Sequence, residues 1–144
     1  MKRVVLSVVL LLALATPAQA KAPGFRAQVH LTLPEVQRIG TSYIIHLTVR
    51  RTATAWIPRF CVDFGDSDNS WKIIMPGMKA YDDDVYCYGT LRTKTKQFYA
   101  RVVPAKTGQK KLEVCFGRAE IHNDVNRADL GADALCWSDT FVLT

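Results

Sequence analysis

The feature that most constrains the fold of this chain is a two-residue alternation of apolar and polar side chains. In the segment 42–51, Tyr43, Ile45, Leu47 and Val49 fall on one face of an extended chain, and mostly polar residues fall on the other. Such a period is typical of a strand with one buried face. Helical periodicity is nearly absent after residue 20, so the alternation predicts an all-β protein.

Short runs of this kind recur between turn-forming residues, and together they predict about seven to eight strands. The predicted strands are 25–33, 42–51, 56–65, 70–75, 84–91, 96–104, 110–117 and 134–143. Pro58 marks its strand as an edge or bulged strand, and Gly108 ends a turn that predicts a hairpin between 96–104 and 110–117. This spacing favours a single antiparallel β-sandwich of the immunoglobulin-like type, with a small β-barrel as the alternative. No repeat or linker divides residues 21–144, which we expect to form one domain.

The first twenty residues have the organisation of a secretory signal peptide. Lys2 and Arg3 precede an apolar run over 4–15, which is too short to span a bilayer comfortably. Ala18-Gln19-Ala20 then supplies the small residues that a signal peptidase accepts, so we expect cleavage after Ala20. The sequence therefore predicts a bacterial periplasmic or secreted protein.

All four cysteines lie after the predicted cleavage site, and they lack the C-x-x-C spacing of redox sites. An even number of cysteines in an exported chain predicts two disulfides. We favour Cys61–Cys87 and Cys115–Cys136, because alternation places Cys115 and Cys136 opposite the apolar face of their strands. The other connectivities of the four residues stay open.

Charge is distributed in blocks along the chain. The whole chain has a formal net charge of +6, but residues 21–60 and 92–111 are basic while 61–91 and 112–144 are acidic. Export argues against nucleic acid as a partner. The basic blocks suit an acidic protein, peptidoglycan or anionic lipid headgroups.

Two thioethers make copper a candidate ligand. Met75 and Met78 are soft ligands, and three histidines could add imidazoles. The stretch from Met75 to Met78 resembles the Met-rich loops of periplasmic copper carriers, which implies copper binding, although the His/Met repeats of those proteins are missing here. The histidines are His30, His46 and His122.

Aspartates make calcium a second candidate. Asp63, Asp66 and Asp68 lie shortly before a second acidic group at 82–84. Asp66 and Asp68 are spaced like the first ligands of an EF-hand, but Trp71 occupies the position where that loop requires glycine. The remaining possibility is an irregular cage of oxygen ligands that joins the two groups.

The same region is a candidate protein-binding surface, because aromatic rings mixed with charge are typical of recognition sites. The candidate residues are Trp71, Tyr81, Asp82, Asp83, Asp84 and Tyr86. The polar segment 122–133 is expected to be an ordered surface loop.

No catalytic motif is present, so the expected function is non-enzymatic. We expect an exported protein-binding module, such as an accessory subunit of an envelope or secretion assembly, or an inhibitor or immunity protein against an envelope-acting enzyme. The alternative is a periplasmic carrier of copper or calcium on a β-sandwich. No cofactor is required by the leading hypothesis.

Overall fold

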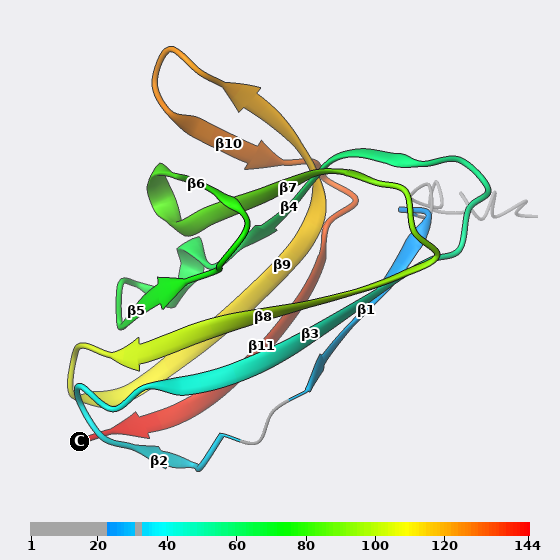
Figure 1. The fold of residues 1–144 in the computed structure, drawn as a ribbon. Coiled ribbons are helices and arrows are strands. Elements are labelled where there is room, and N and C mark those ends of the chain that lie inside the picture. Colours follow the sequence, from blue (N-terminus) through cyan, green and yellow to red (C-terminus); the bar gives the residue numbers. More distant parts are fainter. Residues whose placement is uncertain (1–22, 31–32) are drawn as a thin grey trace, which may run out of the picture.

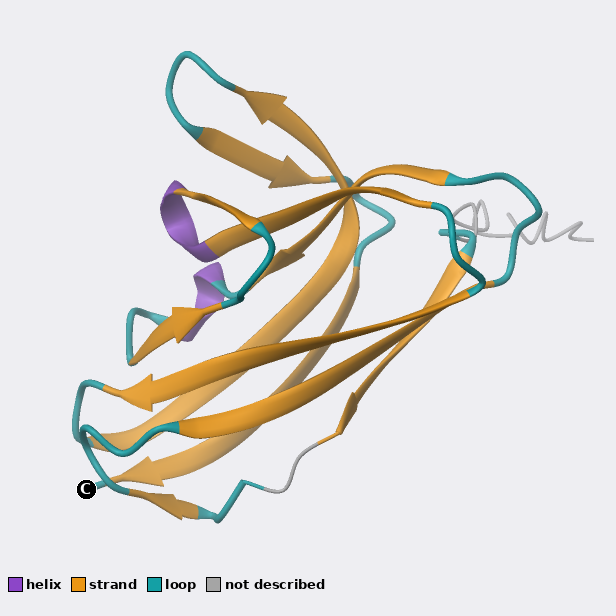
Figure 2. Cartoon of the chain, viewed as in Figure 1, coloured by secondary structure: helices purple, strands orange, loops and turns teal. Residues whose placement is uncertain are grey.

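A computed structural model describes residues 23–30 and 33–144 of the chain. The predicted signal peptide lies outside the described residues. Within the described part, no helix is both long and apolar enough to cross a membrane. Within residues 23–30 and 33–144 strands dominate, and the only helices there are two 3-10 turns, η1 (Gly65–Ser67) and η2 (Asp82–Asp84) (Figure 2).

The strands form two sheets (Figure 1). The four-stranded sheet has the order β1 (Phe25–His30), β3 (Tyr43–Arg51), β8 (Thr95–Pro104), β5 (Trp71–Ile74). The larger sheet has the order β2 (Val36–Gln37), β11 (Leu135–Leu143), β9 (Gly108–His122), β4 (Ile57–Asp63), β7 (Val85–Leu91), β6 (Lys79–Tyr81), and β10 (Arg127–Leu130) pairs with the end of β9. Every pairing is antiparallel except that of β2 with β11.

The prediction of an all-β, two-sheet protein is confirmed, and each predicted strand is present. The predicted hairpin at 105–108 is wrong, because β8 and β9 belong to different sheets and their connection crosses between them. Gly108 has the expected positive φ, +112°. The segment 122–133 is not simply a loop, because it contains β10, and β2 and β6 were also missed.

The core fills the space between the two sheets and receives apolar side chains from both. Phe60 of β4 stacks on Phe98 of β8 at 5.9 Å between ring centroids, which joins the sheets through aromatic contact. The buried Trp71 indole donates a hydrogen bond of 2.8 Å to the side-chain oxygen of Gln37, so β5 is tied to β2 on the opposite sheet.

A second, smaller core lies under the β9–β10 hairpin. The hairpin extends past the two sheets at the end away from the C-terminus (Figure 1). Ala119 and Ala128 from its strands pack with the buried Cys61 and Cys87. The hairpin therefore covers one of the two disulfides.

Both favoured disulfides are present, Cys61–Cys87 and Cys115–Cys136. Each joins directly opposed residues of neighbouring strands in the larger sheet. Pro58 lies in a bulged strand as expected, and Arg59 beside it has φ +51°. This strand is central rather than at an edge, because β4 pairs with both β7 and β9.

Candidate binding surfaces

The three aromatic rings of the predicted protein-binding surface are buried. Trp71, Tyr81 and Tyr86 are 2%, 7% and 7% exposed. They cannot contact a partner in this fold, so the structure does not support their prediction as recognition residues. The alternating pattern of their strands shows that apolar residues are nearby, but it does not show that these three rings themselves point into the core.

Tyr86 has a clear structural role. Its hydroxyl donates a hydrogen bond of 2.7 Å to the backbone carbonyl of Ile73, linking β7 to β5. Burial of the ring, with a smaller contribution from the charge of Asp84, raises the pKa of Tyr86 to about 12. The neutral form of the side chain is therefore the form that the fold favours.

Within the acidic triplet, residues 82–84, Asp82 is bound to the turn of the β9–β10 hairpin. Asp82 is exposed, its backbone N–H donates to the carbonyl of Asn126 at 2.9 Å, and its side chain accepts from the Asn126 amide at 3.1 Å. Asp84 has φ +57°, which turns the chain into β7. The side chain of Asp83 lies outside the described part. Asp82 thus has a structural role that the sequence did not indicate.

The residues predicted to bind metal have separate structural roles. Met75 is 3% exposed and packs in the main core, and Met78 packs against it from a half-buried position. Asp63 accepts a hydrogen bond from the backbone N–H of Gly65 and so shapes the turn that follows β4. Asp68 is exposed in a left-handed conformation, and the side chain of Asp66 is not described.

One cluster of side chains contains the types of donor atom that bind metals. Glu113, Cys115 and Cys136 place their donor atoms within 4.8 Å of one another. The two sulfurs form a disulfide, which removes the thiolates that a metal would need. The carboxylate of Glu113 pairs with Lys111 at 2.9 Å. This geometry gives no support to a metal centre at these residues.

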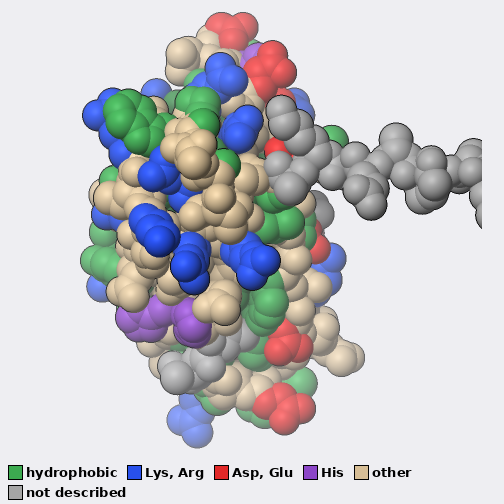
Figure 3. Space-filling view, turned by 90° about the vertical axis from the view of Figure 1, so that its right-hand side faces the viewer, with side chains coloured by type: hydrophobic (Ala, Val, Ile, Leu, Met, Phe, Trp, Pro, Cys, Tyr) green, Lys and Arg blue, Asp and Glu red, His purple; other side chains and the backbone are tan. Residues whose placement is uncertain are grey.

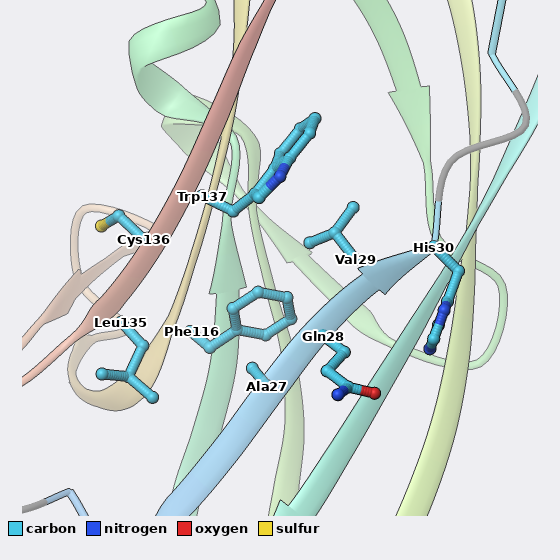
Figure 4. A pocket seen from close by; sticks show the side chains of 8 residues that line it. All are labelled: Ala27, Gln28, Val29, His30, Phe116, Leu135, Cys136 and Trp137. Carbon is cyan, nitrogen blue, oxygen red and sulfur yellow. The ribbon is translucent and has the colours of Figure 1, made fainter.

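A slot opens between the edges of the two sheets. It has a volume of about 460 Å³ and lies between β1 and β11. Figure 4 shows Val29, Phe116 and Trp137 facing one another across it, whereas the sulfur of Cys136 points away. The slot is lined mainly by apolar side chains, with Gln28 and His30 at its β1 side.

The outer face of the four-stranded sheet is the most distinctive exposed surface. Its side chains alternate with the core residues of β1, β3, β8 and β5. We call it the basic face, and it consists of Arg26, Gln28, His30, Ile44, His46, Thr48, Arg50, Lys72, Ile74, Thr95, Gln97, Tyr99, Arg101 and Val103, with Lys94 at its border.

The register orders the basic face into rows. Arg26 lies opposite Arg50, and His30 lies opposite His46, which in turn lies opposite Tyr99. No Asp or Glu is among the residues of this face. In Figure 3 the lysine and arginine side chains gather in the middle of the view beside histidines, and the acidic side chains lie toward its margins.

The basic blocks are visible in the sequence, but the face that they build is not. Basic residues of 21–60 and 92–111 come together because β1, β3 and β8 are neighbours in one sheet. The signal was present in the sequence, since Arg26, Arg50 and Arg101 all fall on the polar side of their alternating strands. The sequence pattern does not show which strands are neighbours, so it could not predict that these residues share one face.

No protein-family model and no curated protein matches this chain. Among solved structures, the chain is similar to one described by the words "AvmM Catalyzes Macrocyclization in Alchivemycin A Biosynthesis", with 12% identity over 84% of this chain and 89% of that chain and a TM-score of 0.49. It is also similar to the human F-spondin reeler domain, with 16% identity over 85% and 91% of the two chains and a TM-score of 0.40. Likenesses of this strength say nothing about activity, ligand or partner.

Proposed function

We propose that this chain is an exported, non-enzymatic binding module that docks an acidic partner protein on its basic face. The observation that carries the proposal is the basic face itself, which presents four cations on neighbouring strands, Arg26, Arg50, Lys72 and Arg101, and no acidic residue. Charge of one sign on a rigid surface steers an oppositely charged partner and fixes its orientation.

The composition of the face suits a protein partner. Exposed apolar and aromatic side chains lie among the cations, with Ile44, Ile74 and Tyr99 exposed by 37%, 42% and 47%. Tyrosine and arginine are enriched at protein interfaces. An accessory subunit of an envelope assembly and an inhibitor of an envelope-acting enzyme would both use such a surface.

We also infer an immunoglobulin-like strand arrangement. Supporting this inference, β1, β3, β8 and β5 follow the order of strands A, B, E and D of that fold, and β4, β9 and β11 follow C, F and G. Here both disulfides lie within the larger sheet, whereas the immunoglobulin disulfide joins the two sheets. The predicted signal peptide supports export.

The test is affinity capture from an envelope extract with the mature, oxidised protein as bait. Arg50→Glu with Arg101→Glu should abolish capture of the acidic partner, because the reversed charges repel it. The matched control is Arg38→Glu with Lys106→Glu, which makes the same charge change in two connecting turns and should capture normally. Equal capture by all three baits would refute the proposal. Capture should also weaken as salt is raised, since exposed charges are screened.

A further inference from the structure

We propose that the end of the basic face formed by Arg26, Arg50 and Lys94 is a binding site for a phosphate group. The inference uses the same face as the proposed function and extends it, but binding of a small anion does not require a partner protein. It stands on two adjoining hollows that share these three cations.

The first hollow has the donors that a phosphate needs. It measures about 540 Å³ and is lined by Arg26, Gln28, Thr48, Arg50, Lys94 and Thr95. Each of these side chains can donate a hydrogen bond, and none carries a negative charge. The second hollow, of about 340 Å³, adds Arg51 and Thr52 to the same three cations.

The cations are held together without a counter-charge. Arg26 and Arg50 are direct partners in the β1–β3 register, and Lys94 immediately precedes Thr95, the β8 partner of Arg50. Among the described residues, none of these three side chains takes part in an ion pair. Like charges directly opposite each other on a sheet are destabilising, so a bound anion would remove a repulsion that the free protein carries.

The chemistry of the cations favours phosphate. Two guanidinium groups can each bind a phosphate through two parallel hydrogen bonds, and a lysine adds a mobile positive charge. Arg51 is oriented by a hydrogen bond of 2.9 Å from its guanidinium to the carbonyl of Thr54, so it borders the site from a fixed position. The larger hollow has room for a diphosphate or a phosphate ester as well as for the inorganic ion.

Calorimetric titration of the mature, oxidised protein with inorganic pyrophosphate tests the site. Wild type should bind saturably at one site, and Arg50→Gln should weaken binding by about tenfold or more, because a charge-assisted pair of hydrogen bonds is lost. Arg38→Gln removes the same charge from the connection between β2 and β3, outside both hollows, and should change the Kd by no more than about twofold. Absence of saturable binding, or an equal loss in both variants, would overturn the proposal.

Thermal melting gives a readout that a merely structural arginine would not produce. Without ligand, Arg50→Gln should melt at the same or a higher temperature than wild type, because a like-charge pair is relieved. Pyrophosphate should raise the melting temperature of wild type and not that of the variant. A variant that melts lower and still gains stability from pyrophosphate would contradict the site.

Vesicles distinguish the two sources of phosphate. The protein is sedimented with vesicles of equimolar phosphatidylglycerol and phosphatidylcholine. If it sediments with them and pyrophosphate abolishes this sedimentation, the site takes lipid headgroups. Binding of pyrophosphate without sedimentation would identify a soluble phosphate ligand. Sedimentation that pyrophosphate does not affect would argue against the hollow. Because capture of a protein partner is measured separately, a failure here would leave the proposed function standing.

Discussion

At the scale of single residues, Tyr86 couples the stability of the fold to pH. Its pKa is raised from 10.0 to about 12, first by burial and then by the charge of Asp84. A raised pKa in the folded state means that the stabilisation is complete below pH 10 and is lost as the pH rises toward 12. We expect the unfolding free energy to fall by roughly 2 kcal/mol across this window.

Denaturation by urea at a series of pH values measures this effect. Tyr86→Phe should lower the unfolding free energy by about 1 kcal/mol at neutral pH, through loss of the hydrogen bond to Ile73, and should flatten the decline between pH 10 and 12. Tyr88→Phe is the control, since this ring lies on the same strand but is 39% exposed. An unchanged decline in Tyr86→Phe would contradict the assignment.

At the scale of elements, the two disulfides should differ in their contribution to stability. Their sequence separations are 26 and 21 residues, so loop entropy gives each about 3 kcal/mol. Cys61 and Cys87 are also buried under the β9–β10 hairpin, whereas Cys136 is exposed. Replacing Cys61 and Cys87 by alanine should therefore cost about 1 kcal/mol more than replacing Cys115 and Cys136, because it opens a cavity. Urea titration of the two double variants measures the difference. Equal losses of unfolding free energy would show that burial under the hairpin adds nothing to the contribution of the Cys61–Cys87 disulfide.

The contact of Asp82 with Asn126 predicts how the β9–β10 hairpin is held. Asp82→Ala should leave the fold intact but speed amide hydrogen exchange in β10, because the side-chain half of a double contact is lost. Asp124→Ala removes an exposed acid from the turn of the same hairpin and should have no such effect. Faster exchange in both variants would point to the charge of the region instead of this contact.

The lengths and pairing of the strands explain how much of the fold could be predicted from the sequence. Alternation locates strands whose two faces differ, such as β3 and β8. It missed β2 and β6, of two and three residues, because they are too short to show a period. It also read 105–108 as a hairpin, since turn chemistry is local and cannot tell a connection within one sheet from one between two sheets.

The candidate site was harder to predict than the fold. Strand alternation favoured the disulfide pairing that the structure contains. The mixture of aromatic rings and charge, in contrast, predicts Trp71 and Tyr86 at a recognition surface, whereas their rings pack inward. Whether a ring in a short strand points in or out depends on what the opposite sheet offers, here Gln37 and Ile73. The basic face depends on strand order, which is set by contacts between distant segments.

At the scale of the whole molecule, one face gathers cations and has no acidic residue among its described side chains. The basic face lies on the four-stranded sheet, while Asp82 of the acidic triplet is bound to the β9–β10 hairpin of the larger sheet. A partner docked on the basic face, as proposed, would therefore meet none of the protein's own carboxylates among the side chains of that face. Docking of an acidic partner on this face is the central claim of the proposed function.

Amine labelling of the protein with and without its captured partner tests that claim most directly. Lys72 and Lys94 lie on and beside the basic face, and Lys79 and Lys106 lie elsewhere, and all four are exposed. We predict that the partner protects Lys72 and Lys94 from acetylation and leaves Lys79 and Lys106 reactive. Protection of Lys79 with full reactivity at Lys72 and Lys94 would contradict the claim, and would place the partner near β6, away from the basic face.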